Sequence, residues 1–392
     1  MMPRVVVMGG SLGGLNAALW LRDLGCEVTV FERSPNPLQA RGAGIAALHQ
    51  TLRYPKLHGR DPESVCSSTS SITFLRSDGS VRGQLPYRYL FSSWNTIYRT
   101  FLGAFGDQRY RLGSAVESFT DHGDVVQVRL ADGSSAEADL LVCTDGVNSL
   151  ARPVLVPEAV GRYAGYVAWR GTVPEAELSA GSFEALADSL TYQAVPSSHV
   201  LVYPIPGPDG ATARGERLIN VVWYRNVAAG AEFTDLMTGV DGRVREVSLP
   251  PGAARPELVS QLRRTAAEVL APALAEAVCA VPQPFVQAIV DIEVPVMARG
   301  RVCLLGDAAF VVRPHAAAGT AKAAEDGWKL AEHLRFTDGD VPAALAGWNA
   351  EQVALGADLV RRTRTIGDRS QFGGGLSPED PDLLYGLYHP GD

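Results

Sequence analysis

The stretch from Arg4 to Arg33 constrains the fold most, because it has the order strand, glycine-rich turn, helix and second strand. The apolar run over residues 5–8 predicts a short buried strand, and Gly9 to Gly14 (GGSLGG) predicts a tight turn. Gly25 ends the predicted helix, and a second strand over residues 28–31 finishes at Glu32. This order is typical of a βαβ unit with parallel strands.

A turn of this kind can bind a dinucleotide. The helix after it begins with free N–H groups and a partial positive charge, and glycine lets a pyrophosphate come close to them. Glu32 follows Gly14 by 18 residues, where a carboxylate can bond a ribose hydroxyl. Ser11 stands where the middle glycine of the motif is usual, so an ordinary tight turn remains the alternative.

A second strand-turn-helix stretch runs from Arg301 to Leu334. The apolar run over residues 302–305 predicts a parallel strand, and Gly306-Asp307 places a carboxylate just beyond its end. A helix is predicted after the following loop, with Glu325 four residues ahead of Lys329. Since open α/β sheets bind ligands at the carboxyl ends of their strands, Asp307 is a candidate ligand-binding residue.

The chain between residues 163 and 287 has a different character. It alternates polar and apolar residues between Pro/Gly turns, which indicates a separate antiparallel sheet. Beyond Leu334 a long apolar stripe predicts a helix, and the tail after Gly373 is expected to fray at Pro378 and Pro390. The predicted strands cover residues 166–170, 190–194, 199–205 and 218–225, and one helix is predicted over residues 257–270.

Composition narrows the partners. A chain of 392 residues favours two domains, and a net charge of −8 argues against nucleic acid or an anionic membrane as the main partner. The five cysteines are scattered and form no CxxC pair, so neither a metal site nor a disulfide framework is indicated. No stretch approaches the roughly 18 apolar residues of a membrane span. We therefore expect a cytoplasmic protein that acts on small molecules.

Three separated motifs carry a family resemblance. They are the glycine-rich turn with Glu32, the DGxxSxxR pattern from Asp145 to Arg152, and the GDAA pattern from Gly306 to Ala309. In this order they resemble the single-component FAD-dependent aromatic hydroxylases, the para-hydroxybenzoate hydroxylase-like family. The resemblance implies an α/β fold, α+β overall: a Rossmann-like FAD domain with an inserted, mostly antiparallel β-sheet substrate domain and C-terminal helices. The implied divisions are 1–162, 163–287 and 288–392, with residues 72–95 expected to add strands to the substrate domain.

The resemblance also implies which residues bind FAD. Asp307 would bond the ribityl chain or the pyrophosphate, and the loop over residues 314–321 would pass beside the isoalloxazine ring. Residues 41–44 (RGAG) would form a second glycine-rich loop near the cofactor. The family often has PxxGxG and an Asn at this loop, whereas this chain has alanine at 317 and 321. The implied FAD contacts are Gly9, Ser11, Leu12, Gly14, Glu32, Arg33, Arg99, Val116, Asp145, Asp307, Pro314, Gly319, Thr320 and Ala321.

The implied reaction is hydroxylation of a small hydroxylated aromatic or N-heteroaromatic ring by way of a flavin C4a-hydroperoxide. NAD(P)H would be a transient co-substrate, O2 the oxidant, and a homodimer is a family-level expectation. His315 is the candidate general base, because an unperturbed imidazole titrates near physiological pH, and the alternative is that it only holds the loop by a backbone bond. A dehydrogenase or epoxidase on the same fold, or a non-catalytic nucleotide-binding module, is the alternative. The candidate substrate contacts, each with a core role as its alternative, are Arg170, His199, Tyr203 and Trp223.

Overall fold

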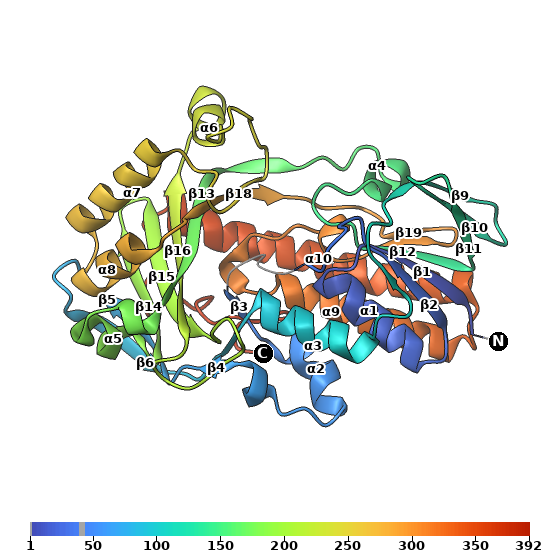
Figure 1. Ribbon diagram of the computed structural model, residues 1–392, viewed down its shortest axis with the longest axis horizontal. Helices are drawn as coiled ribbons and strands as arrows, with labels where there is room; N and C mark the ends of the chain where they lie inside the picture. The colour runs from blue at the N-terminus through green and yellow to red at the C-terminus, as the bar shows by residue number, and fades with distance from the viewer. Residues whose placement is uncertain (1, 39–43) are drawn as a thin grey trace.

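Two sheets organise the molecule. The structure is a computed structural model that describes residues 2–38 and 44–392. A mostly parallel sheet lies at the N-terminal end of the molecule and a larger, mostly antiparallel sheet at the other (Figure 1). The mixed α/β class expected from the sequence is confirmed.

The smaller sheet has six strands in the order β19-β20-β12-β1-β2-β8. The five strands from β20 to β8 run parallel to one another, and β19 pairs antiparallel with β20. The β12 run Leu-Leu-Val-Cys is buried at every position, as expected for a parallel strand covered on both faces. The strands are β1 (Arg4–Met8), β2 (Glu27–Phe31), β8 (Tyr110–Arg111), β12 (Leu140–Cys143), β19 (Ala298–Arg299) and β20 (Val302–Leu304).

The larger sheet has eight strands in the order β17-β18-β13-β16-β15-β14-β5-β6. All pairs are antiparallel except β14 with β5. β18 pairs with β13, so this sheet extends past the boundary expected at residue 287. Its strands are β5 (Ser71–Leu75), β6 (Val81–Pro86), β13 (Arg162–Pro174), β14 (Ser189–Val195), β15 (Ser198–Ile205), β16 (Leu218–Asn226), β17 (Ser248–Leu249) and β18 (Phe285–Asp291).

Two small three-stranded sheets complete the strands. One contains the hairpin predicted around Asp132-Gly133, and in the other β7 pairs antiparallel with β3 and β4. Their strands are β9 (Val116–Asp121), β10 (Val126–Leu130) and β11 (Ser135–Ala138), and β3 (Gly44–Ala46), β4 (Ser67–Ser68) and β7 (Leu90–Ser93).

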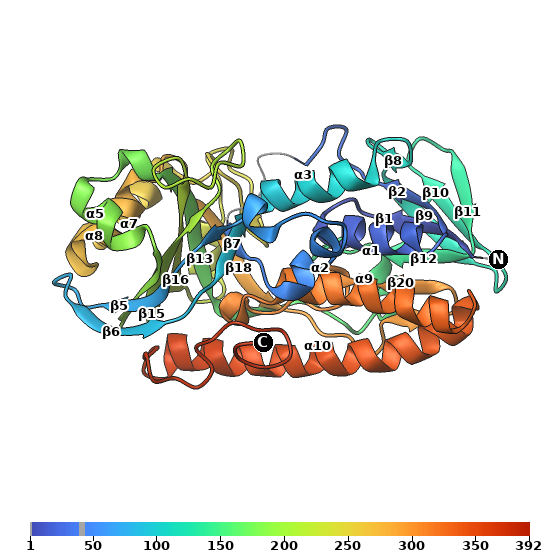
Figure 2. The same ribbon diagram turned by 90° about the horizontal axis from the view of Figure 1, so that it is seen from below.

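Helices cover both sheets. α7 and α8 lie on the outer face of the large sheet, and α10 runs along the molecule beneath both parts (Figure 2). In the part of the chain that the structure describes, no helix is long and apolar enough to cross a membrane. The α-helices are α1 (Leu12–Asp23), α2 (His49–Leu57), α3 (Trp94–Phe105), α4 (Ala151–Leu155), α5 (Ala180–Leu186), α6 (Ala231–Leu236), α7 (Pro256–Val269), α8 (Pro272–Ala280), α9 (Gly319–Phe336) and α10 (Val341–Phe372).

Small residues let α1 and α9 cross closely. A Cβ atom on Gly327 of α9 would lie 2.8 Å from the Cα of Ala17, so only glycine fits at this crossing. The two helices follow β1 and β20, which are separated in the sheet only by β12. Because β1 and β20 run in the same direction, both helices begin at the same edge of the sheet.

The helix predicted over residues 257–270 is found as α7. A second helix that the sequence did not predict, α8, begins at Pro272, a position where the missing N–H of proline costs nothing. The expectation that the tail after Gly373 frays is wrong, because Leu376, Leu383, Tyr385 and Leu387 are buried in the core of the large sheet.

Candidate active site

The turn after β1 leaves the start of α1 open. Gly9 has φ +105°, and a Cβ on it would lie 2.5 Å from the carbonyl oxygen of Thr144. A Cβ on Gly14 would lie 2.0 Å from the oxygen of Gly9, so both positions require glycine. Ser11 is the N-cap and makes no side-chain cap bond, and no acidic residue lies in the first turn from Leu12. The first N–H groups of α1 can therefore bind an anion.

The residues expected around the adenosine come from three elements: Glu32 and Arg33 follow β2, Val116 begins β9, and Arg99 lies on α3. The Glu32 carboxylate accepts bonds from the N–H groups of Gly10 (2.9 Å) and Ser34 (2.8 Å) and keeps lone pairs for further donors. Arg33 is exposed beside it, and Val116 is half-buried at the start of β9. Arg99, on α3, is exposed and donates to the carbonyl oxygen of Pro208 (2.9 Å). The part of the expected second glycine-rich loop at residues 41–43 lies outside the described residues.

Hydrogen bonds connect the DGxxSxxR motif (residues 145–152) to the GDAA motif (residues 306–309). Asp145 accepts from Ser149 Oγ (2.7 Å) and from the N–H of Leu150 (2.6 Å), so its carboxylate shapes its own turn. Arg152 donates to the carbonyl oxygen of Ala308 (3.1 Å) and thereby fixes the position of Asp307. Asp307 faces the cleft, where partial desolvation by the surrounding protein raises its pKa to about 6 and the Arg152 charge opposes this rise.

The loop before α9 presents a second open helix start. Residues Pro314–Ala316 form a 3-10 turn, Ala317 is left-handed at φ +51°, and the first turn of α9 from Gly319 contains no acidic residue. Behind it, Asp326 pairs with Lys322 and accepts the N–H of Gly306 (3.0 Å). This buried pair anchors the helix to the turn that bears Asp307. Ala321 is buried behind Gly319 and Thr320, which face the cavity described next.

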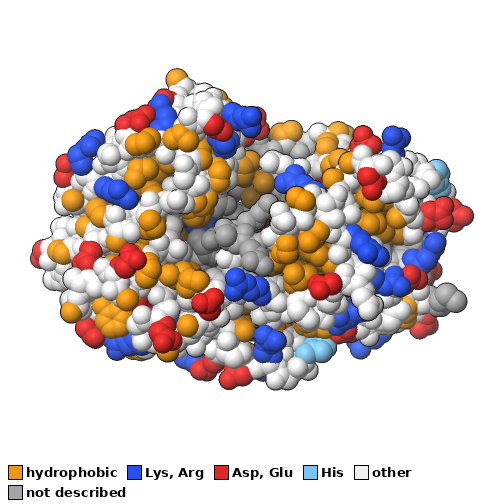
Figure 3. All heavy atoms as spheres, in the orientation of Figure 1, with side chains coloured by type: hydrophobic (Ala, Val, Ile, Leu, Met, Phe, Trp, Pro, Cys, Tyr) orange, Lys and Arg blue, Asp and Glu red, His pale blue; other side chains and the backbone are white. Residues whose placement is uncertain are grey.

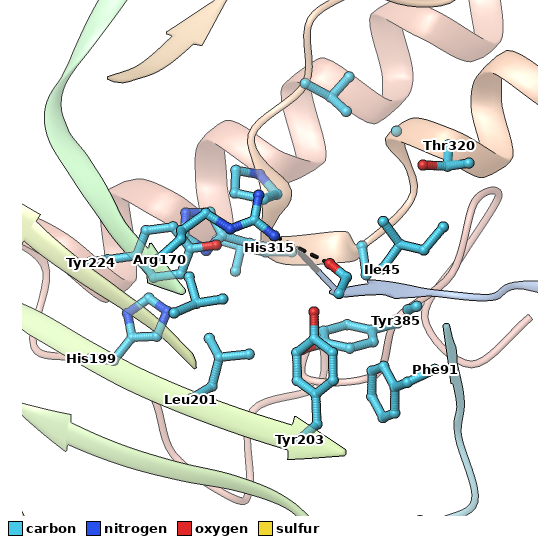
Figure 4. Close-up of a pocket in the computed structure, with 18 of the residues that line it drawn as sticks. Ile45, Phe91, Arg170, His199, Leu201, Tyr203, Tyr224, His315, Thr320 and Tyr385 are labelled. Atoms are coloured by element: carbon cyan, nitrogen blue, oxygen red, sulfur yellow. Dashed lines mark hydrogen bonds between the residues drawn. The ribbon is translucent and has the colours of Figure 1, made fainter. Parts of the chain in front are cut away.

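A cavity of about 260 Å³ lies between the large sheet and the loop before α9. The surface of the molecule is hollowed between its two parts (Figure 3). One row across β13, β16, β15 and β14 faces the cavity, because these residues are direct cross-strand neighbours: Arg170, Val222, Leu201 and Tyr192. From the other side Pro314, His315, Gly319 and Thr320 close it. The hydroxyl of Tyr203 points into this space, beside Phe91 and Tyr385 (Figure 4).

Arg170 brings a cation to the cavity wall without a counter-ion. Its guanidinium donates to Gln287 Oε1 (3.0 Å) and to the carbonyl oxygen of Gly44 (3.1 Å). Among the residues that the structure describes, no carboxylate lies within salt-bridge distance of it, and its buried Nε has no partner. Arg170 can accept an anionic ligand in the cavity.

His315 and His199 are buried and neutral. Tyr166 Oη lies 2.7 Å from His315 Nε2, and Gln371 Nε2 lies 2.9 Å from His199 Nδ1. Burial lowers the pKa of His199 to about 3. Burial, with the nearby His199 and Arg313, holds the pKa of His315 well below its ordinary value. Burial thus moves the pKa of His315 away from physiological pH, and its role as general base stays a prediction.

Trp223 does not reach the cavity. It pairs directly with Trp169, one residue away from the Arg170–Val222 pair, so it points to the opposite face of the sheet. There it packs in the cluster under α7 and α8 and donates from Nε1 to Ser198 Oγ (3.0 Å). Tyr224 faces the cavity instead, and alternation along the strand is the signal that separates the two. Sequence reasoning also missed these wall residues: Phe91, Tyr192, Leu201, Gln287, Leu376, Asp382, Leu383 and Tyr385.

The described residues fit FAD better than a metal. Two open helix starts and an unpaired carboxylate line one sheet edge, which suits a dinucleotide with a flavin at its end. Among the described residues, no group of three His, Cys, Asp or Glu side chains could hold a metal ion. The fold and this site together define a flavoprotein with a substrate cavity beside the cofactor.

Comparison with known proteins identifies the class. Residues 163–291 match the family model described as FAD binding domain-like, and residues 4–52 match that of pyridine nucleotide-disulphide oxidoreductases. The chain is 34% identical to 2,6-dihydroxypyridine 3-monooxygenase of Paenarthrobacter nicotinovorans, over 98% of this chain and 96% of that one.

Solved structures agree. 2,6-Dihydroxypyridine-3-hydroxylase from Arthrobacter nicotinovorans superposes with a TM-score of 0.93 at 33% identity, covering 100% of this chain and 98% of that one. Klebsiella pneumoniae HpxO, solved with FAD and uric acid, gives a TM-score of 0.77 at 25% identity and covers 95% of this chain and 89% of its own. The chain belongs to the FAD-dependent aromatic hydroxylases, the para-hydroxybenzoate hydroxylase-like family of single-component flavoprotein monooxygenases.

Proposed function

We propose that the protein hydroxylates a small, single-ring hydroxypyridine or phenol that binds as an oxyanion, with NAD(P)H as electron donor. The observation that carries this proposal is Arg170, a cation without a counter-ion in a cavity of about 260 Å³. A guanidinium favours an ionised ring hydroxyl, and ionisation makes the ring a better nucleophile. The similarity to 2,6-dihydroxypyridine 3-monooxygenase supports the same substrate class.

FAD supplies the oxygen-activating chemistry when bound, and the chain positions it. In this proposal Gly9, Ser11, Leu12 and Gly14 offer the start of α1 to the pyrophosphate, and Asp307 bonds the ribityl chain or pyrophosphate. Asp145 acts by holding its turn. Glu32, Arg33, Arg99 and Val116 surround the adenosine, with Arg99 giving up its bond to Pro208. The flavin ring lies along Pro314, Gly319, Thr320 and Ala321 at the start of α9.

The cavity side chains orient the ring. Arg170 and the Tyr203 hydroxyl contact its oxygen atoms, while His199 and His315 remain neutral hydrogen-bond partners. In this proposal the Arg170 charge favours the ionised ring hydroxyl, and His315 remains the candidate general base although burial lowers its pKa. Five free cysteines support a reducing, cytoplasmic setting, and a homodimer remains part of the proposal.

A turnover screen tests this function. The purified holoenzyme is mixed with NADH or NADPH and a panel of dihydroxypyridines and phenols, and NAD(P)H oxidation, hydroxylated product and peroxide are measured separately. Single-ring substrates with an ionisable hydroxyl should accelerate NAD(P)H oxidation and yield product in a ratio near one. If none of them yields a hydroxylated product, the proposed substrate class is wrong.

A further inference from the structure

The C-terminal segment, residues 373–392, contributes a wall to the substrate cavity. Leu376, Asp382, Leu383 and Tyr385 all line it. Leu376, Leu383 and Tyr385 are each at most 7% exposed, so the segment is packed rather than draped over the surface. In the family resemblance drawn from the motifs, this segment has no assigned role.

Hydrogen bonds fix the segment to both sides of the cavity. The N–H of Tyr385 donates to Tyr89 Oη (2.8 Å), and the hydroxyls of Tyr385 and Tyr192 lie 2.6 Å apart, which ties the segment to the large sheet. The N–H of Gly386 donates to the carbonyl oxygen of Ala316 (3.2 Å), in the loop before α9. The wall thus bridges the substrate sheet and the loop along which the flavin would lie.

Two helices hold the rest of the segment. Tyr388 Oη donates to Glu325 Oε1 (2.6 Å) on α9, and Arg362 of α10 donates to the carbonyl oxygens of Gly386 and Leu387. Leu387 is buried but does not line the cavity. The segment therefore contains two kinds of leucine: Leu383, which faces the cavity, and Leu387, which only anchors the segment.

We propose that residues 373–392 form a specificity-determining wall, which limits the cavity to single-ring substrates and keeps water away from the flavin. Packed interiors have few voids, so shortening a wall side chain opens space that either water or a larger ring can fill. The size limit rests on the proposed function, whereas the solvent barrier requires only that FAD is bound.

Acrylamide quenching of flavin fluorescence tests the barrier without any substrate. In the FAD-loaded protein, Leu383→Ala should raise the quenching constant by about 2-fold or more, because it opens the wall. Leu387→Ala is the matched control: it makes the same chemical change in the same buried segment, and its quenching constant should stay at the wild-type value. Equal quenching in the wild type and Leu383→Ala, or an equal rise in both variants, would overturn the barrier.

Substrate selection tests the size limit. The ratio of kcat/KM for a single-ring hydroxypyridine to that for a bicyclic hydroxyquinoline should fall about 10-fold in Leu383→Ala, the scale expected for a few methylene groups of pocket space. Leu387→Ala should keep the wild-type ratio when both variants are assayed well below their unfolding temperatures. An unchanged ratio in Leu383→Ala overturns the size limit. A wild type that hydroxylates neither ring refutes the proposed substrate class, while quenching still decides whether the wall exists.

Discussion

The two sides of the cleft bind their ligands by different means. On the side of the parallel sheet, the turn after β1 and the start of α9 offer mainly backbone N–H groups, and glycine is needed where a Cβ would clash. On the side of the large sheet, cross-strand rows of side chains such as Tyr192, Leu201 and Arg170 form the wall. Substitutions on the side of the large sheet can therefore change the substrate without loss of the cofactor, because backbone donors do not depend on side-chain identity.

The largest effect is expected on the cofactor side, at Asp307. Asp307→Ala removes the open carboxylate at the end of β20 and should leave the purified protein without flavin, since one bond to a charged group contributes about 1.5–3 kcal/mol. The flavin-to-protein absorbance ratio measures this loss. Asp124→Ala, in the exposed turn between β9 and β10, should keep normal flavin. A normal flavin ratio in Asp307→Ala would refute the cofactor role of this carboxylate.

A change on the substrate side should spare the flavin. Arg170→Met is expected to keep normal flavin content but to lower kcat/KM about 10- to 100-fold, because the ring oxyanion loses a charged partner. The apparent pKa of the bound ring hydroxyl should rise, and Arg170→Lys should recover part of the activity.

The control for this prediction lies on the opposite face of the same sheet. Arg225 is one residue after Tyr224 and stacks its guanidinium against Trp223, away from the cavity. Arg225→Met should therefore retain near wild-type kcat/KM. If both arginine variants lose activity equally, the loss reflects the stability of the sheet, and the contrast between its two faces is refuted.

The difference between the two sides also explains what the sequence could predict. The βαβ unit and the GD turn are contiguous in the chain, so their glycines and Asp307 could be placed from spacing alone. Alternation predicted the strands of the large sheet, including the one that carries His199 and Tyr203. It could not relate Trp223 to Arg170, because that relation depends on the register between β13 and β16. The residues after Gly373 show no periodic pattern, so the sequence could not predict that Leu383 and Tyr385 line the cavity.

A smaller effect is expected on the substrate side, where the buried His199 should make the free energy of unfolding fall as the pH drops below 6.5. The pKa of His199 is lowered to about 3 in the folded protein, so the unfolded chain binds a proton first as the pH falls. Folding stability contributed by the neutral ring is therefore present above about pH 6.5 and is lost, by about 1.4 kcal/mol per pH unit, as the pH falls toward the folded pKa.

Replacing the ring should remove this pH dependence. In urea unfolding of the holoenzyme at pH 7.5 and pH 5.5, His199→Gln should show a smaller loss of unfolding free energy than the wild type. His122→Gln, in an exposed turn, should follow the wild type. The comparison of slopes cancels the contributions of the other titrating groups. Parallel slopes in the wild type and His199→Gln would mean that water reaches the cavity face.

The smallest effect is expected at Ala317, where the loop departs from the family's PxxGxG pattern. Its φ of +51° is a left-handed conformation that costs an alanine about 1–2 kcal/mol, while a glycine there would add about 0.4–1 kcal/mol of unfolded-state entropy. Ala317→Gly should therefore raise the free energy of unfolding by at most about 1.6 kcal/mol. Ala316→Gly, at an ordinary backbone conformation next to it, should lower it. Because the alanine already holds the backbone that a glycine would adopt, flavin content should be the same in Ala317→Gly as in the wild type. A loss of flavin in that variant would show that the Ala317 methyl group itself supports the cofactor, against the view that this loop contacts the cofactor through backbone atoms.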